Sequence, residues 1–244
     1  MLRTHSRPLV KGLCSKQFAL CSSLCLGIAG TTILSKYVNL LSAQLAFSNI
    51  FIYSFLYTPL KRLSIFNTDV GALVGAIVPL IGWSSASCIP NISSDLLDGK
   101  CLILPLILFS WQFLHFYPLS HLIGQDYLRA GYKMAILQRP LFCRISCFAH
   151  SCLIAAICHL SASKFDFVTP KCALYCLAPI NILAIGLSSK YLLNGCIGNA
   201  RILFRFSLVH LPYILSVYLL KNCPYLHKSL TDTESYFKKA FGII

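Results

Sequence analysis

Long apolar runs that recur at regular intervals are the feature of this sequence that most constrains its fold. They lie at about residues 18–34, 38–57, 70–88, 98–120, 141–160, 168–190 and 201–220. A helix needs about 20 mostly apolar residues to cross the hydrocarbon core of a bilayer, and these runs have about that length. They are continuous rather than alternating, which favours helices over the strands of a β-barrel. The sequence therefore predicts an all-α fold, a polytopic bundle of about seven helices that span the lipid bilayer.

The composition supports a membrane protein and argues against a water-soluble one. Hydrophobic residues make up 57% of the 244 residues and charged residues only 11%, and the mean hydropathy is +0.71. We expect one transmembrane domain over residues 1–220, without internal repeats, and a solvated C-terminal tail over residues 221–244.

Lysine and arginine are distributed unequally between the two predicted sides of the membrane. Without the C-terminal tail, the loops of one side carry four, and those of the other carry eleven: Arg3, Arg7, Lys11, Lys16, Lys61, Arg62, Arg129, Lys133, Arg139, Lys190 and Arg201. The positive-inside rule places the side with eleven in a bacterial cytoplasm or a mitochondrial matrix. Membrane topology therefore accounts for the net charge of +14, and we expect no nucleic acid as a partner.

The most informative segment joins the second and third predicted spans. Its parts are, in order, YTPLKR (57–62), Asn67 and GALVGAIVPLIGW (71–83). Three further segments accompany it along the chain: RTHSRPL (3–9), WQFLHF (111–116) and DYLRAG (126–131). In order and spacing these motifs resemble those of the protoheme IX farnesyltransferases, a branch of the UbiA-type intramembrane prenyltransferases.

This resemblance implies a reaction, a cofactor and a set of site residues. A farnesyl group would pass from farnesyl diphosphate to a vinyl group of haem B, which forms haem O, in the mitochondrial inner membrane. Haem A synthase is an expected partner. The implied cofactor is Mg²⁺, with Asp126 as a metal ligand. The implied catalytic residues are Lys61, Arg62, Tyr57 and Asn67, and the implied substrate-binding residues are Arg3, Arg7, His115, Tyr127 and Arg129.

The chemistry of a prenyl diphosphate agrees with these assignments. Its diphosphate is a polyanion and its tail is apolar, so the two ends need opposite surroundings. Lys61 and Arg62 lie where a predicted span meets its loop, and both can donate hydrogen bonds to phosphate oxygens. The ring faces of Tyr57 and Tyr127 can attract a developing allylic cation.

Each of these residues also has a purely structural interpretation. Lys61, Arg62 and the tyrosines are common anchors at a membrane interface. Asn67 can cap a helix instead of binding a ligand. Asp126 is one of only seven acidic residues but can be a solvated loop residue, and His115 can be an ordinary interfacial side chain.

Two glycines, Gly71 and Gly75, form a GxxxG pair within the third predicted span. Such a pair lets two helix backbones approach closely. We expect it to serve helix packing rather than chemistry.

The resemblance is incomplete at the N-terminal end. The family carries an aspartate-rich motif, NDxxDxxxD, ahead of the segment that RTHSRPL resembles, and this sequence begins with Met1 just after that point. We therefore expect a chain that lacks the first two of the family's nine spans and half of the metal site. Two alternatives follow: an inactive isoform or incomplete gene model that keeps membrane packing or haem or partner binding, and a transporter or channel.

Overall fold

Helices account for every regular element in the part of the chain that the structure describes. The computed structural model describes residues 4–86, 99–165 and 168–222. The elements are α1 (Lys16–Tyr37), α2 (Leu40–Phe51), η2 (Ile52–Tyr57), α3 (Thr58–Leu63), α4 (Asn67–Ala86), α6 (Lys100–Leu122), α7 (Gly124–Arg129), α8 (Ala135–Gln138), α9 (Pro140–Ser163), α10 (Pro170–Cys172), η3 (Ala173–Leu177), α11 (Ala178–Leu193) and α12 (Ile197–Asn222). Within these ranges seven helical stretches are long and apolar enough to cross a membrane. The predicted all-α bundle is confirmed.

Two of the sequence-based assignments fall on parts of the chain that the structure does not describe. Arg3, an expected substrate-binding residue, is one of them. The other is the predicted solvated tail, of which only the first two residues belong to α12 and the rest lies outside the described residues.

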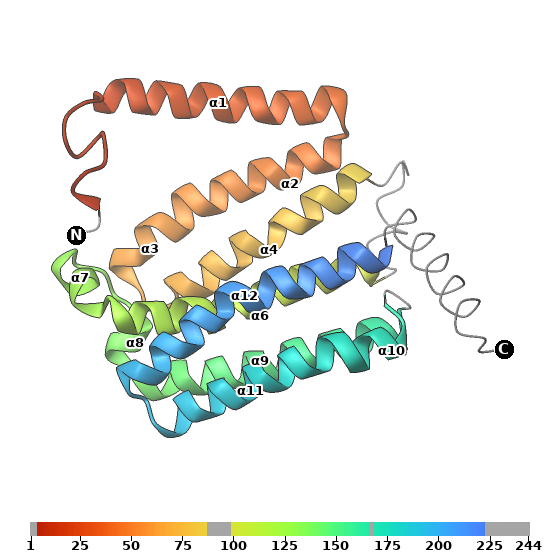
Figure 1. Ribbon diagram of the computed structural model, residues 1–244. Coiled ribbons are helices and arrows are strands. Elements are labelled where there is room, and N and C mark those ends of the chain that lie inside the picture. Colours follow the sequence, from red (N-terminus) through yellow and green to blue (C-terminus); the bar gives the residue numbers. More distant parts are fainter. Residues whose placement is uncertain (1–3, 87–98, 166–167, 223–244) are drawn as a thin grey trace, which may run out of the picture.

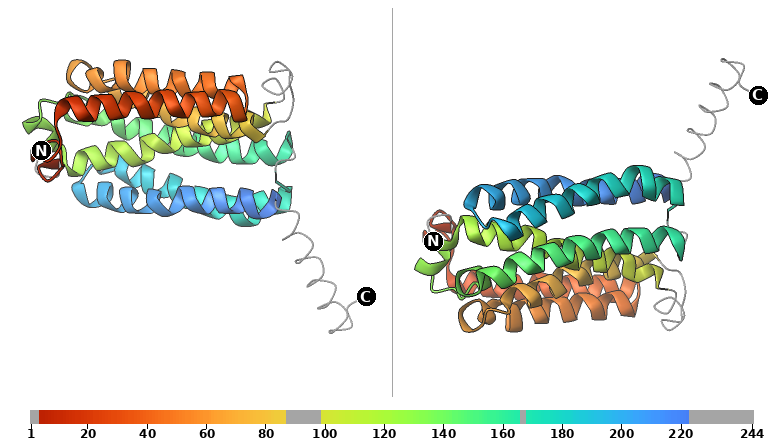
Figure 2. Two further views of the ribbon diagram at one scale, coloured as in Figure 1. Left: turned by 90° about the horizontal axis from the view of Figure 1, so that it is seen from above. Right: turned by 90° about the horizontal axis from the view of Figure 1, so that it is seen from below.

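The spans run alternately in opposite directions, which gathers the connecting segments at the two ends of the bundle. The N-terminal arm, α3, α7 and α8 lie together at one end (Figure 1), and two views turned by 90° show the same arrangement (Figure 2). This end carries the segments with Arg7, Lys61 and Arg129. It is therefore the end that the distribution of lysine and arginine predicts for the cytoplasmic or matrix side.

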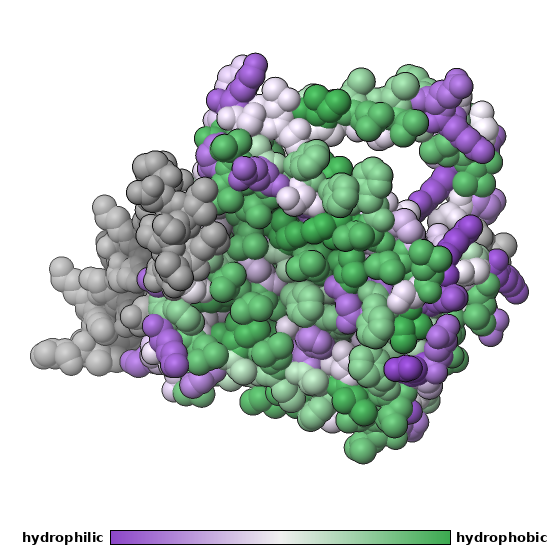
Figure 3. Space-filling model, turned by 180° about the vertical axis from the view of Figure 1, so that it is seen from behind, coloured by the Kyte–Doolittle hydropathy of each residue, from purple (hydrophilic) through white to green (hydrophobic). Residues whose placement is uncertain are grey.

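The outer surface of the bundle suits a bilayer. Hydrophobic side chains cover the face shown in Figure 3, and hydrophilic ones gather mainly at its ends. Among the exposed side chains are Phe18 of α1, Phe47 of α2 and Leu183 of α11. Apolar residues that would be a liability in water are expected where helices face lipid.

α6 and α1 are the two extremes of packing in the bundle. α6 packs against α4, α9 and α12, and half of its most apolar stretch is buried. α1 packs against α2 and buries no side chain. The space-filling view shows an opening between α1 and the remaining helices (Figure 3). α6 is therefore the helix around which the bundle is built, and α1 is its least integrated span.

Serine hydroxyls join neighbouring spans inside the bundle. Ser42 Oγ of α2 lies 2.7 Å from Ser84 Oγ of α4, and Ser151 Oγ of α9 lies 2.7 Å from Ser188 Oγ of α11. All four side chains are buried. Because burial of apolar surface does not drive helices together within lipid, close packing and such hydrogen bonds take its place.

Candidate functional site

A cavity of about 480 Å³ opens between η2, α4 and α6 at the end of the bundle that carries α7. One wall consists of α4 residues, namely Asn67, Thr68, Gly71, Val74 and Gly75. The facing wall consists of α6 residues at helical spacing, namely Gln112, Phe116 and Leu119. The remaining lining comes from the N-terminal arm, η2, α3 and the segment after α6. The cavity therefore brings together residues that are far apart in the sequence.

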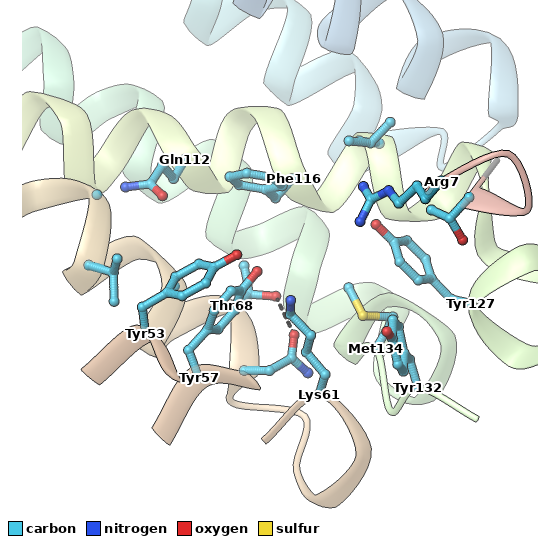
Figure 4. Close-up of a pocket in the computed structure, with 16 residues that line it drawn as sticks. Arg7, Tyr53, Tyr57, Lys61, Thr68, Gln112, Phe116, Tyr127, Tyr132 and Met134 are labelled. Atoms are coloured by element: carbon cyan, nitrogen blue, oxygen red, sulfur yellow. Dashed lines mark hydrogen bonds between the residues drawn. The ribbon is translucent and has the colours of Figure 1, made fainter. Parts of the chain in front are cut away.

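Two cationic side chains face this cavity from different segments. Lys61 comes from α3 and Arg7 from the N-terminal arm, and Figure 4 shows both pointing into the space between them. They are close enough for the charge of Arg7 to act on Lys61. Among the described residues the acidic ones are Asp69 and Asp126, and neither lines the cavity. Two like charges that no lining acid balances form a site that attracts an anion.

Four tyrosines surround the two cations. Lys61 Nζ lies 4.3 Å from the centroid of the Tyr57 ring and 5.9 Å from that of Tyr53. On the other side, the rings of Tyr127 and Tyr132 lie 5.9 Å apart, and Figure 4 shows Tyr127 beside Arg7. Aromatic faces attract cations, so Tyr53 and Tyr57 help to hold Lys61 in the cavity.

Tyr53 and Tyr57 share one face because they lie four residues apart on a helical stretch, and the local sequence accounts for the π-helical turn between them. Pro59 has no N–H and cannot donate to the carbonyl four residues earlier. The chain forms the π-helical turn η2 just before it, and Thr58 Oγ1 donates to Tyr53 O at 2.9 Å. π-Helical turns are frequent at functional sites because they change the direction of the side chains around them.

Asn67 ties together the two loops that border the cavity. Its Nδ2 donates to Ser64 O and to Lys133 O, both at 2.8 Å, and Lys133 N donates to Lys61 O at 2.8 Å. Because both neighbours of Nδ2 are carbonyl oxygens, the orientation of this amide is settled. Asn67 is only 2% exposed, and its Oδ1 accepts from Thr68 Oγ1 at 3.4 Å. This geometry shows a structural clasp, while a catalytic role for Asn67 stays a prediction.

The glycine pair of α4 leaves room for two side chains of the cavity. A Cβ atom on Gly71 would lie 2.8 Å from Tyr57 Cε2. A Cβ atom on Gly75 would lie 2.8 Å from Gln112 Cδ and would contact Gln112 Nε2 even more closely. Gln112 belongs to α6, which packs against α4, so the expectation that Gly71 and Gly75 serve helix packing rather than chemistry stays a prediction. Their missing side chains leave room for Tyr57 and Gln112.

Gln112 is a site residue that the sequence analysis missed. Its Nε2 donates to Ala72 O at 2.9 Å and to Leu108 O at 3.3 Å. Figure 4 shows it at the end of the cavity away from Arg7. The sequence feature that could have pointed to Gln112 is its position as an amide in the middle of an apolar run. It stands four residues before Phe116 and hence lies on the same face of α6. The other missed lining residues include Thr4, Tyr53, Thr68, Val74, Phe116, Leu119, Tyr132 and Met134. Of these, Tyr53 stands four residues before Tyr57.

The structure brings only part of the predicted site together. Arg7, Tyr57, Lys61, Asn67 and Tyr127 line the cavity, whereas Arg62, His115, Asp126 and Arg129 do not. Arg62 and Arg129 are exposed. The roles predicted for these residues stay predictions.

The ring of His115 packs against α12 instead of facing the cavity. Its Nδ1 lies 3.0 Å from Ser207 Oγ. The ring stacks on Trp111 with 4.7 Å between centroids and contacts Phe204 at 4.9 Å. These contacts give His115 a clear packing role between α6 and α12.

The described side chains do not form a Mg²⁺ site on their own. Among them no group of three or more histidine, cysteine, aspartate or glutamate residues is arranged to hold a metal. Asp69 has a buried Oδ2 without a hydrogen-bond partner, but it does not line the cavity. Mg²⁺ prefers carboxylate and other oxygen ligands in near-octahedral geometry, and the side-chain oxygens of the described residues that line this cavity are all neutral ones, from tyrosine, threonine, asparagine and glutamine.

Comparison with known proteins identifies the family. Residues 1–207 match the UbiA prenyltransferase family. The chain belongs to this family. It is 39% identical over 219 residues to the human protein named "Protoheme IX farnesyltransferase, mitochondrial", an alignment that covers 90% of this chain and 47% of that relative. It is 36% identical over 246 residues to the Arabidopsis thaliana protein of the same name, covering 100% of this chain and 53% of that relative.

The fold of this member of the UbiA family also matches a solved structure. That structure is described as providing insights into the biosynthesis of digeranylgeranylglyceryl phosphate synthase in membranes; it superposes with a TM-score of 0.71 at 16% identity and covers 90% of this chain and 75% of its own. At this identity the likeness establishes the fold alone. The chain spans about half the length of the curated relatives that it matches.

Proposed function

We propose that the cavity binds a prenyl diphosphate, and that the protein transfers a farnesyl group from farnesyl diphosphate to a vinyl group of haem B to form haem O. The observation that carries this proposal is the pair of cations, Lys61 and Arg7, at one end of the cavity. Among the described residues that line this cavity, none is acidic. The names of the human and Arabidopsis relatives support farnesyl as the donor group and haem as the acceptor. They also support the mitochondrial inner membrane as the location.

Lys61 and Arg7 bind the diphosphate and stabilise its departure. Both donate charge-assisted hydrogen bonds to its oxygens, and these strengthen as the allylic C–O bond breaks and negative charge collects on the leaving group. The π electrons of the haem vinyl group then bond to the allylic carbon. Water adds to the cation that this leaves beside the haem ring and loses a proton, which gives the hydroxyethylfarnesyl group of haem O.

The tyrosines around Lys61 stabilise the positive charge that develops on the farnesyl group in the same step. The faces of Tyr53 and Tyr57 lie beside the cation that holds the diphosphate. They are therefore near the carbon that loses the diphosphate, and their rings attract its positive charge. Phe116 and Leu119 help to keep water away from that carbon.

Mg²⁺, with Asp126 as one ligand, remains the expected cofactor. When bound, it would neutralise part of the diphosphate charge, and its ligands would come largely from diphosphate oxygens and water, as is common for Mg²⁺ in phosphate sites. Haem A synthase, which would consume haem O, remains the expected partner.

The proposal is tested in lipid vesicles that contain the purified chain, haem B, farnesyl diphosphate and Mg²⁺. We expect vesicles with the protein to retain more farnesyl diphosphate than protein-free vesicles do. Farnesol has the same tail without the anion and enters lipid on its own, so its retention should not depend on the protein, and we expect mass spectrometry to detect haem O. An equal protein-dependent increase for both compounds would contradict the anion site. Selective retention without haem O would contradict the transfer step for this chain.

A further inference from the structure

We propose that Gln112, which lies over Gly75, is the end wall of the cavity and sets the length of prenyl tail that the protein accepts. This inference rests on the proposed function, because it takes a prenyl diphosphate as the ligand. It gives a role to the inner end of the cavity, which lies away from the diphosphate and takes no part in its departure.

The direction of the tail follows from the two ends of the cavity. Arg7 and Lys61 hold the diphosphate at one end, and Gln112 lies at the other (Figure 4). Between them the lining is largely apolar and includes Val74 and Phe116. A tail that leaves the diphosphate through this lining ends at Gln112.

The length of the cavity along α4 matches a farnesyl tail. From Asn67 to Gly75 the helix advances eight residues at about 1.5 Å each, or about 12 Å. An extended chain advances about 1.2 Å per bond, so each isoprene unit of four backbone bonds adds about 5 Å. The same length also has to hold part of the diphosphate, so a tail of three units, about 14 Å long, already has to bend, and a tail of four units, about 19 Å long, exceeds the cavity by more.

The end wall is fixed in place by hydrogen bonds and by packing. Gln112 Nε2 donates to Ala72 O at 2.9 Å and to Leu108 O at 3.3 Å, and the side chain is 8% exposed. Gly75 leaves room for the amide only because it has no Cβ. A longer tail has to displace the amide and break these hydrogen bonds, and a hydrocarbon offers nothing in exchange.

The test measures how the affinity for prenyl diphosphates depends on tail length. The full-length protein in lipid nanodiscs is titrated with geranyl (C10), farnesyl (C15) and geranylgeranyl (C20) diphosphate. In Gln112→Ala, which removes the wall, we expect the affinity for C20 relative to C15 to rise at least about tenfold. In Gly75→Ala, whose methyl group pushes the amide into the cavity, we expect the affinity for C15 relative to C10 to fall by a similar factor.

A matched control lies on the same helix. A Cβ atom on Gly82 would have nothing within 4 Å, so Gly82→Ala should leave both affinity ratios unchanged. Each ratio is measured on one preparation, so a variant that folds only in part still reports it. Gln112→Met keeps the volume of the wall but loses both hydrogen bonds, so its preference for C15 should lie between that of the wild-type protein and that of Gln112→Ala.

The outcomes separate this inference from the function on which it rests. If the wild-type protein binds C15 well but Gln112→Ala and Gly75→Ala keep its ratios, the inference is overturned and the proposed function stands. If the wild-type protein binds none of the three diphosphates, the proposed function fails, and the inference fails with it.

Discussion

Replacing Lys61 by glutamine should weaken the binding of farnesyl diphosphate far more than the same replacement of Arg62. The two residues are adjacent in α3, and both match the family motif. Only Lys61 lines the cavity, where its Nζ lies 4.3 Å from the centroid of the Tyr57 ring, whereas Arg62 is exposed. The pair therefore offers a test of the anion site with almost identical substitutions.

The expected magnitude follows from the kind of interaction that is lost. A hydrogen bond to a charged group contributes about 1.5–3 kcal/mol, which corresponds to a rise in Kd of about 10- to 150-fold for Lys61→Gln. An exposed charge that is screened by solvent contributes less than about 1 kcal/mol, so Arg62→Gln should raise Kd by at most about fivefold.

The assay is equilibrium titration of the protein in lipid nanodiscs with farnesyl diphosphate, at low and at high ionic strength. Salt weakens interactions between exposed charges, so the small effect of Arg62→Gln should shrink further at high salt while that of Lys61→Gln persists. Equal losses of affinity in the two variants would refute the reasoning, because they would mean that position relative to the cavity does not matter and that both residues are interfacial anchors.

Three further predictions concern residues around the cavity. Asn67→Ala removes the buried amide that donates to Ser64 O and Lys133 O and should lower the free energy of unfolding by about 1–3 kcal/mol, measured by thermal or denaturant unfolding in detergent. Gly71→Ala places a methyl group against the Tyr57 ring and should weaken farnesyl diphosphate binding by about tenfold through displacement of that ring, measured in the same titration. His115→Ala removes the stacking and the hydrogen bond to α12 and should lower the free energy of unfolding by about 1–3 kcal/mol with little change in Kd.

Each of these predictions has an outcome that would contradict it. Unchanged stability of Asn67→Ala would show that the clasp between the two loops does not contribute. Gly71→Ala is compared with Gly82→Ala, and equal Kd values for the two would show that the Tyr57 ring is not seated on Gly71. A large loss of haem O formation in a fully stable His115→Ala variant would support the substrate-binding role that the sequence predicted for His115.

The spans could be predicted from the sequence because their determinant is local. A run of about 20 apolar residues has few stable alternatives in a bilayer, and the predicted runs fall on the observed helices. The run predicted at 70–88 corresponds to α4, which begins three residues earlier at Asn67. The polar start of α4 has no hydropathy signal, since its structure depends on hydrogen bonds to the loop after α7.

The site was predicted only in part because the direction of a side chain depends on helix phase and packing. Neighbouring residues on a helix point about 100° apart, so a motif that contains Lys61 and Arg62 does not say which of them faces inward. The same holds on α6, where Gln112 and Phe116 share one face and His115 lies on another. For Gly71 and Gly75 the sequence correctly indicated a need for space but not which group fills it.

The weak attachment of α1 makes a bound diphosphate a crosslink between two parts of the protein. Lys61 belongs to the main bundle, whereas Arg7 belongs to the arm that leads into α1, which buries no side chain. A ligand that both residues hold joins the arm to the bundle. By mass action, a ligand at 100 times its Kd adds about 2.7 kcal/mol to the stability of the state that binds it. If the proposed substrate binds in this way, it adds a link between α1 and the rest of the protein to the one that packing of α1 on α2 provides.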